Sequence, residues 1–224
     1  MPTKLALIHT SPSLTPMFQA LCAAWLPGVE VFHMVDESLI RNTVAAGYLE
    51  TATTRRVISQ IDSAGRAGAN AVLVTCSSIG EAVTTAAGLF DFPVIRVDDA
   101  MAEKAVNMGN RIGVLATLRT TLEPTRTLVH KMAQAMAPGR QITVVDMLCD
   151  GAFDAVMAGD GPTHDAIVRA ALLNLMTQVD VVVLAQASMA RVLGAMEPAS
   201  LIVPVLSSPE LAVQRVAEVL KARG

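Results

Sequence analysis

Cys76 is the residue of this sequence with the clearest capacity for chemistry. It lies in "LVTCSSIGEAV" (residues 73–83), where strand-like residues lead into a cysteine, two serines and a helix start. The free N–H groups and the positive dipole end at the start of a helix favour an anion. A thiol with an ordinary pKa of about 8.5 is therefore expected to titrate closer to neutrality there. The pattern predicts a reactive thiolate at Cys76; the alternative is a small cysteine that only packs at the strand end.

The sequence contains two copies of one pattern, which pairs residues of the first half with residues of the second. The paired segments are "KLALIHT" (4–10) with "RIGVLAT" (111–117), "NAVLVTCSS" (70–78) with "DVVVLAQAS" (180–188), and "VDDAMAEKAV" (97–106) with "LSSPELAVQRV" (206–216). Their order is kept and their offsets lie between 107 and 110 residues. At the predicted strand ends the alignment pairs Thr10 with Thr117, Cys76 with Gln186, Ser78 with Ser188, and Asp98–Asp99 with Ser207–Ser208.

Short apolar runs predict the fold that positions these residues. The runs are "LALIH" (5–9), "AVLVT" (71–75), "VIRV" (94–97), "IGVLAT" (112–117), "ITVVD" (142–146), "VVVLA" (181–185) and "LIVPVL" (201–206). Runs that are apolar throughout are typical of strands covered on both faces. The segments between them, such as 51–67 and 163–178, have helical length and spacing, and Thr163 is the expected N-cap of the second. The predicted class is α/β, with two similar Rossmann-like units and mainly parallel sheets.

The duplication also sets the expected domain organisation. Residues 1–97 are predicted to form the first α/β unit and residues 98–207 the second, with a C-terminal helix over 208–222 packed on the first unit. We expect the units to be related by a pseudo-twofold axis. Because α/β sheets bind ligands at the carboxyl ends of their strands, the active site is expected in a cleft between the units.

Composition excludes several classes of protein. Hydrophobic residues make up 52% of the chain and charged residues 17%, which argues against disorder. The net charge is −3 with no basic cluster, so a nucleic-acid partner is not expected, and no apolar run is long enough for a membrane span. Three cysteines without scaffold spacing are typical of free thiols in a reducing cytoplasm, where we expect the protein to work. The sequence has no GxGxxG, Walker, CxxC or HExxH motif, so neither a nucleotide nor a metal site is predicted.

The motifs "VTCSSIG", "RIGVLAT" followed by "LRTT", "VVVLAQASMARV" and "LSSP" resemble, in this order, those of the aspartate/glutamate/hydantoin racemase superfamily. The resemblance implies two α/β domains around a small carboxylate substrate such as an amino acid, a hydantoin or a dicarboxylate. It further implies no cofactor, a homo-oligomer, and one cysteine from each half that exchanges a proton with the carbon beside the carboxylate. Cys76 is then the first thiol. The positions that resemble substrate-binding ones are His9, Thr10, Ser11, Ser77, Ser78, Thr117 and Thr121.

The sequence departs from the family pattern at Gln186, where the resemblance places the second cysteine. An amide does not exchange protons near neutral pH, although it hydrogen-bonds an oxyanion, so Gln186 is expected to orient the substrate together with Ser188 and Ser208. One alternative is that Cys149 or His9 supplies the missing acid and racemisation is kept. The other is a reaction that needs one thiol only, either a decarboxylation or a cis–trans isomerisation in which Cys76 attacks a double bond. A hypothesis of another class is a binding protein that has kept the site and lost turnover.

Other reactive residue types are expected to be structural. Cys22 has helical apolar spacing and is predicted to pack in the core. His164 is expected to be a solvated residue of a first helical turn. Asp98 and Asp99 are expected to cap the helix that follows them rather than to act as paired acids.

Overall fold

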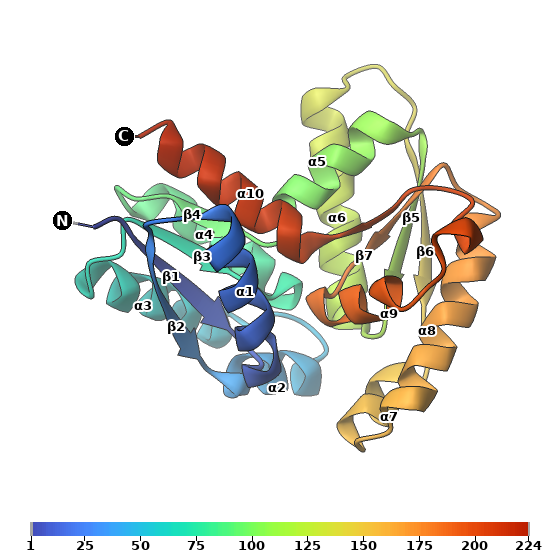
Figure 1. Ribbon diagram of the computed structural model, residues 1–224, viewed down its shortest axis with the longest axis horizontal. Coiled ribbons are helices and arrows are strands. Elements are labelled where there is room, and N and C mark those ends of the chain that lie inside the picture. The colour runs from blue at the N-terminus through green and yellow to red at the C-terminus, as the bar shows by residue number, and fades with distance from the viewer. Residues whose placement is uncertain (1, 224) are drawn as a thin grey trace. The chain divides into compact units, whose positions relative to one another are not determined.

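The computed structural model describes residues 2–223 of the chain. Its contacts divide into two compact units, Met1–Asp99 with Pro209–Gly224, and Ala100–Ser208. Each unit holds one four-stranded sheet in which every strand pair is parallel (Figure 1). The predicted α/β class with two similar parallel-sheet units is thereby confirmed. The pseudo-twofold axis and the cleft stay predictions.

The first unit has the strand order β2-β1-β3-β4. Its strands are β1 (Lys4–His9), β2 (Glu30–Val35), β3 (Ala71–Val74) and β4 (Val94–Arg96). Its helices are η1 (Pro12–Leu14), α1 (Thr15–Trp25), α2 (Glu37–Ala46), α3 (Thr51–Arg66), η2 (Ser77–Ile79), α4 (Gly80–Ala86), η3 (Ala87–Leu89) and α10 (Ser208–Lys221). Figure 1 shows α1 across one face of this sheet and α3 on the other. On the α3 face, Ile8 and Val74 pack with Val57, Ile61 and Val83 in one buried cluster.

The second unit repeats this plan with the order β6-β5-β7-β8. Its strands are β5 (Arg111–Ala116), β6 (Thr143–Leu148), β7 (Val181–Leu184) and β8 (Val205–Ser207). Its helices are α5 (Asp99–Met108), α6 (Arg119–Met136), α7 (Ala152–Met157), α8 (Gly161–Met176), η4 (Ala187–Met189), α9 (Ala190–Gly194) and η5 (Pro198–Ser200). Leu172, Leu175 and Val182 belong to the buried cluster that joins α8 to the sheet.

The register of the strands tests the alignment of the two copies. Leu5 pairs with Ala71 in the first sheet and Ile112 with Val181 in the second, which are the offsets of 107 and 110 residues expected from the sequence. The last strands differ from expectation, because Val74 pairs with Arg96 whereas Leu184 pairs with Ser207. Ser207 is therefore equivalent to Arg96 within the strands. The helices that follow begin at Asp99 and Ser208, which are the residues that the sequence alignment pairs.

Two strands and one helix start differ from the predictions. β2 was not expected, because "EVFHMV" is an edge strand with half-exposed residues and lacks a continuous apolar run. The run 201–206 gives only the three residues of β8, since Pro204 has no N–H for the ladder. α8 begins at Gly161, and its N-cap is Asp160, whose side chain accepts a hydrogen bond from the Thr163 N–H.

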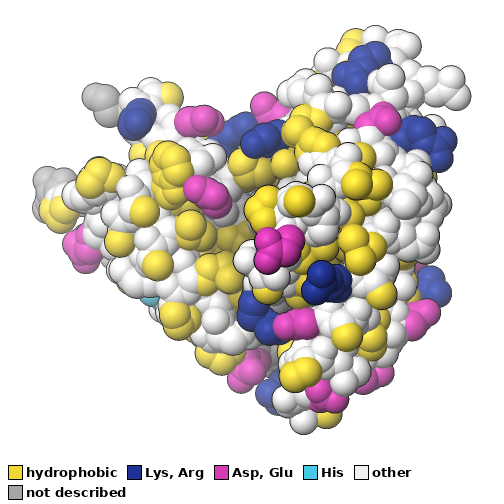
Figure 2. Space-filling model, turned by 45° about the vertical axis from the view of Figure 1, so that its right-hand side comes forward, with side chains coloured by type: hydrophobic (Ala, Val, Ile, Leu, Met, Phe, Trp, Pro, Cys, Tyr) yellow, Lys and Arg dark blue, Asp and Glu magenta, His cyan; other side chains and the backbone are white. Residues whose placement is uncertain are grey.

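The charged side chains form no large patch on the face drawn in Figure 2, where Lys and Arg are interspersed with Asp and Glu. No helix among residues 2–223 is long and apolar enough to cross a bilayer.

Candidate active site

Cys76 lies directly after β3, at the start of a 3-10 turn that leads into α4. It is the N-cap residue of η2 with an extended backbone (φ −127°, ψ 116°), and its side chain is only half-buried. The thiol interacts with the hydroxyls of Thr10 and Ser78 and with the N–H groups of Ser78 and Ile79, although neither N–H reaches the geometry of a capping hydrogen bond. Four donors thus surround the sulfur, as a thiolate or an anionic ligand requires.

The pKa of Cys76 is nevertheless raised, and the expected lowering is wrong for this structure. Desolvation by the surrounding protein is the largest effect and raises the pKa, while the hydroxyls of Thr10 and Ser78 and the two N–H groups lower it. The sequence indicated the hydrogen-bond donors around the thiol but not the desolvation of the thiol by the folded protein. At neutral pH the resting group is therefore the neutral thiol, held where donors are ready to stabilise its anion.

The neighbouring hydroxyls differ in their availability. Ser77 is buried and its Oγ has no hydrogen-bond partner, which is costly unless a ligand or water supplies one. Thr10 is buried and directed to the thiol. Ser11 lies further out, and its hydroxyl is hydrogen-bonded to that of Ser13 (2.8 Å). The first unit thus brings Thr10, Cys76 and Ser78 together, and Ser11 is not part of this group.

His9 has no ring nitrogen left for a substrate. It is fully buried, with Nδ1 hydrogen-bonded to Thr75 Oγ1 (2.8 Å) and Nε2 to His33 Nδ1 (2.8 Å). Burial, and secondly the charge of His33, lower its pKa to about 4. A neutral imidazole with both nitrogens bound inside the protein does not fit a substrate contact or a second acid.

Gln186 occupies in the second unit the place that Cys76 has in the first. It follows β7, it is the N-cap residue of η4, and its backbone is similarly extended (φ −116°, ψ 134°). Its side chain folds back on Thr117: the Thr117 N–H donates to Gln186 Oε1 (2.6 Å), and Gln186 Nε2 donates to Thr117 Oγ1 (2.6 Å). The pair of Thr10 with Cys76 is therefore equivalent to the pair of Thr117 with Gln186. In the second pair the two residues hydrogen-bond each other twice.

The remaining predicted residues of the second unit are more scattered. Thr121 is buried in the first turn of α6, Ser188 is exposed in η4, and Ser208 is fully buried at the start of α10 with an unpartnered Oγ. Thr117 and Gln186 are joined to each other by two hydrogen bonds.

Comparison with known proteins now identifies the chain. The sequence profile described as Asp/Glu/Hydantoin racemase matches residues 7–216. The chain belongs to the Asp/Glu/hydantoin racemase family. No curated protein sequence matches it.

Solved structures of racemases share its fold. Allantoin racemase from Klebsiella pneumoniae is 21% identical with a TM-score of 0.72, over 99% of this chain and 89% of that one. Glutamate racemase from Thermus thermophilus, in complex with beta-chloro-D-alanine, is 22% identical with a TM-score of 0.75, over 100% and 82%. Aspartate racemase from Picrophilus torridus is 14% identical with a TM-score of 0.73, over 96% and 94%. At these identities the likeness supports the family's α/β fold.

Cys149 is a core residue of the second unit and does not fit the alternative role of a second acid. It is 2% exposed and packs with Leu115, Ala152 and Val168 in the core of the second unit. Burial, and secondly Asp150, raise its pKa to about 12. Cys22 is also buried, as predicted, and desolvation raises its pKa to about 11.

His164 is buried at the start of α8, so its expected solvation is wrong. Its Nδ1 is 2.8 Å from Asp165 Oδ1, and Asp165 in turn accepts two hydrogen bonds from Arg191 of α9 (2.6 and 2.7 Å). This array ties α8 to the helix that follows the Gln186 turn.

Arg96 packs against Gly80 in the turn that follows Cys76, a contact that the sequence did not predict. Its guanidinium is buried, donates to both Asp98 oxygens (3.0 Å each) and to Thr84 Oγ1 (3.1 Å), and lies so close to Gly80 that a Cβ there would meet Nη2 at 2.5 Å. Asp98 is therefore a buried partner of Arg96. The available signals were an arginine inside an apolar strand and a glycine at the helix start.

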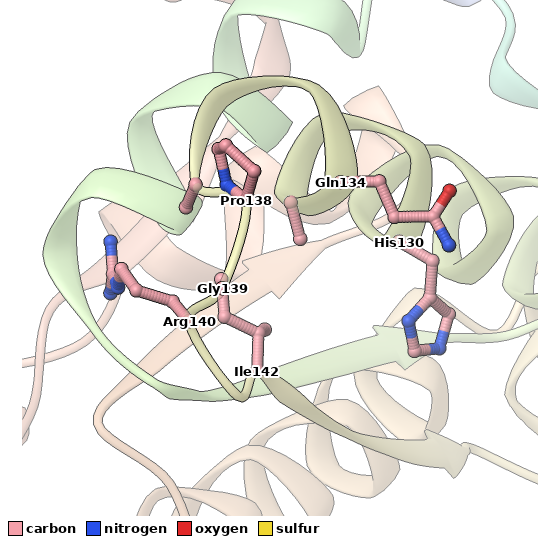
Figure 3. A pocket seen from close by; sticks show the side chains of 8 residues that line it. His130, Gln134, Pro138, Gly139, Arg140 and Ile142 are labelled. Atoms are coloured by element: carbon pink, nitrogen blue, oxygen red, sulfur yellow. The ribbon is translucent and has the colours of Figure 1, made fainter.

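A cavity of about 300 Å³ in the second unit is lined by none of these residues. Figure 3 shows it in the second unit, between His130 and Gln134 of α6 and the loop from Pro138 to Ile142. Arg140 in its wall donates to the carbonyls of Val106 and Gly109. Among residues 2–223 no three His, Cys, Asp or Glu side chains are grouped so that they could hold a metal ion.

Proposed function

We propose that the protein is an enzyme that adds a proton, from the thiol of Cys76, to the carbon beside a carboxylate of a small substrate. The observation that carries this proposal is the contrast between equivalent positions: a thiol among hydrogen-bond donors at Cys76, and an amide bound at both ends at Gln186. Proton transfer from one side only distinguishes this reaction from a two-thiol racemisation.

The absence of a suitable second acid among the candidates supports one-sided chemistry. Gln186 does not ionise and its amide is engaged with Thr117. Cys149 packs in the core with a pKa of about 12. His9 has both ring nitrogens bound and a pKa of about 4. A racemase would need a group that accepts or donates a proton on the opposite face of the carbon.

The raised pKa of Cys76 favours the role of proton donor. In the decarboxylation of a malonate-type substrate the bond to one carboxyl group breaks, CO2 leaves, and the electron pair stays on the carbon as an enediolate. The S–H proton of Cys76 then forms the new C–H bond, and the thiolate regains a proton from water. A neutral thiol is ready for this step, and the hydroxyls of Thr10 and Ser78 stabilise the transient thiolate. Cis–trans isomerisation, which begins with a thiolate attack, is less well served by the raised pKa.

The substrate class follows from the donors around the thiol. The unpartnered Ser77 hydroxyl, together with those of Thr10 and Ser78, suits the oxygens of a carboxylate or enediolate. The Thermus thermophilus relative was solved with a small amino acid, beta-chloro-D-alanine. We extend this substrate class, small carboxylates and amino acids, to the present chain; the reaction requires neither a cofactor nor a metal.

The test is incubation of the wild-type protein in deuterium oxide with disubstituted malonates, amino acids and hydantoins, followed by proton NMR and chiral chromatography. We expect one deuterium at the α-carbon of a decarboxylated product, in one enantiomer, and loss of this reaction in Cys76→Ala. Turnover that survives in Cys76→Ala would refute the role of the thiol. Racemisation by the wild type would instead support a racemase with two proton carriers. A rise in melting temperature with ligand, without any reaction, would identify a binding protein.

A further inference from the structure

Four side chains of the first unit form a continuous hydrogen-bonded chain that begins next to the thiol. Thr75, the residue before Cys76, has its Oγ1 2.8 Å from His9 Nδ1. His9 Nε2 is 2.8 Å from His33 Nδ1, and His33 Nε2 is 2.8 Å from Gln19 Oε1. The chain runs from a buried threonine through a buried and a half-buried histidine to an exposed glutamine.

The direction of the chain follows from its outer end. Gln19 Oε1 only accepts, so His33 donates from Nε2 and its neutral ring accepts at Nδ1. His9 therefore donates from Nε2 and accepts at Nδ1. The single hydroxyl proton of Thr75 then faces two acceptors, His9 Nδ1 at 2.8 Å and the Ile8 carbonyl at 3.2 Å, and the shorter contact is the one to His9. One tautomer of each histidine is compatible with the contacts from Gln19 to Thr75, and His33 selects the tautomer of His9.

The second unit lacks this chain, although its backbone is equivalent. The strand register places Ala116 where the first unit has His9, and Asp146 where it has His33. Ala185 stands at the position of Thr75. The side chains thus occur only in the half that carries the thiol, and the fold itself does not need them.

The chain joins the two strand ends that present the thiol and its hydroxyl donor. The ladder between β1 and β3 ends at Ile8 and Val74. Beyond it the Thr75 N–H donates to the Ile8 carbonyl (3.0 Å), which the Thr75 hydroxyl also approaches (3.2 Å). Beyond that point the bond between His9 and Thr75 is the side-chain link, and the next residues are Thr10 and Cys76. The spacing between the Thr10 hydroxyl and the thiol depends on these ends staying together.

We propose that His9 is a positioning residue, held in one tautomer by His33, which through Thr75 keeps the Thr10 hydroxyl on the thiol of Cys76. The inference rests on the proposed function only in taking Cys76 as the reactive group.

The surroundings of the two rings contain few other ionising groups. His9 packs against Phe18 (ring centroids 5.6 Å apart) and against His33 (5.1 Å). The helix that carries Phe18 and Gln19, α1, has no acidic or basic residue, and its one thiol, Cys22, has a pKa of about 11. Desolvation lowers the pKa of His33. Near neutral pH both rings are neutral, as the directed chain requires.

The test uses two variants of His9 that each keep one half of its bonding. In His9→Asn an amide oxygen takes the place of Nδ1 and keeps the bond to Thr75, whereas in His9→Gln the amide nitrogen takes the place of Nε2 and keeps the bond to His33. Each variant loses one hydrogen bond, so a merely structural role predicts equal effects. The readout is the pH profile of Cys76 alkylation by iodoacetamide, followed by mass spectrometry of the Cys76 peptide, with exposed His130→Asn as the control.

We expect the alkylation midpoint to stay near the wild-type value in His9→Asn and His130→Asn, and to rise by about one pH unit in His9→Gln, since a hydrogen bond to a thiolate is weakened. Equal shifts in both His9 variants, or none in either, would overturn the proposal. Nitrogen NMR of the wild type is an independent check: the inference requires His9 protonated at Nε2, and the Nδ1–H tautomer would contradict it. Alkylation needs no substrate, so a lack of turnover, which would end the proposed function, leaves this result readable.

Discussion

At the scale of single residues, Cys76 and Gln186 show how equivalent backbone positions take different chemical roles. Both are N-cap residues of a 3-10 turn after the third strand of their sheets. At Cys76 the neighbouring threonine directs its hydroxyl to the sulfur, and at Gln186 the neighbouring threonine is consumed by the amide. The two sites therefore differ in which groups remain free, and not in backbone design.

Replacement of the amide by a thiol is predicted to change the stereochemical outcome. In Gln186→Cys the Thr117 N–H and hydroxyl are released, and a second proton carrier stands at the position equivalent to Cys76. A positioned acid or base contributes about 10²-fold or more to proton transfer at carbon. We expect this variant to lose the enantiomeric purity of its product and to racemise chiral carboxylates.

The matched control for this prediction is Gln186→Ala, which also frees Thr117 but adds no acid. Chiral chromatography of the products from both variants separates the two effects. If Gln186→Ala racemises as fast as Gln186→Cys, the open threonine and not the new thiol is responsible.

At the scale of elements, the turn from β3 into α4 packs against the buried ion pair of Arg96 with Asp98. Arg96 of β4 is held by Asp98 and Thr84 and presses on Gly80, the first residue of α4. In the second unit, the register aligns Ser207 with Arg96, and Ala190 opens α9 as Gly80 opens α4. The second unit thus has alanine in place of Gly80 and lacks the arginine that would collide with its methyl group. This supports a steric reason for glycine at position 80.

Gly80→Ala is accordingly predicted to destabilise the protein by about 1–3 kcal/mol, the usual range for overpacking a buried site. The new methyl would lie 2.5 Å from Arg96 Nη2, and the guanidinium is held by its partners. Urea denaturation measures the change. Gly88→Ala, where no heavy atom lies within 4 Å of the added carbon, is expected to leave stability within about 0.5 kcal/mol or to raise it; an equal loss in both variants would contradict the steric argument.

At the scale of the whole molecule, the two units share one plan but bury different groups. The chain leaves the first unit after Asp99 and returns at Pro209, so the second unit is an insertion within the first. The first unit buries His9, Arg96 and Asp98, whereas the second has Ala116 in place of His9. The second unit instead buries His164 and Cys149, so each half has its own set of buried ionising groups.

His9 and Asp99 are predicted to act in opposite directions on stability between pH 4 and pH 6. Because the pKa of His9 is lowered from 6.5 to about 4, the unfolded chain binds more protons in this window, and the stability from His9 falls as the pH falls. Burial raises the pKa of Asp99 from 3.8 to about 6, against Arg96 and with the aid of Asp98, so there the folded protein binds more protons and stability falls as the pH rises. Each effect amounts to at most about 3 kcal/mol.

The difference between variants measures these effects. We expect the wild type to show a nearly flat free energy of unfolding from pH 4 to pH 6, His9→Asn to lose stability as the pH rises, and Asp99→Asn to gain it. Chemical denaturation at several pH values gives the slopes, with His130→Asn as the control that keeps the wild-type profile. Parallel slopes in all three proteins would show that neither group titrates as described.

The sequence by itself determined the α/β class, the family and most of the strands. Strands covered on both faces must be apolar throughout, so β1, β3, β5 and β7 leave continuous runs that local reading finds. The strand-end position of Cys76 and its equivalence with Gln186 also followed from spacing, because one duplicated unit repeats its register. β2 was not predicted, because an edge strand exposes part of its surface and has no such run.

Only the tertiary structure decided which side chains are in contact and how their surroundings shift their pKa values. His9 meets Thr75 66 positions along the chain and His33 24 positions along it, and Arg96 reaches under Gly80 from another strand. No local spacing encodes such contacts, since parallel strands bring distant residues together only after the sheet forms. The pKa of Cys76 was misjudged for the same reason: the donors are its neighbours in sequence, whereas its desolvation comes from the folded protein around it.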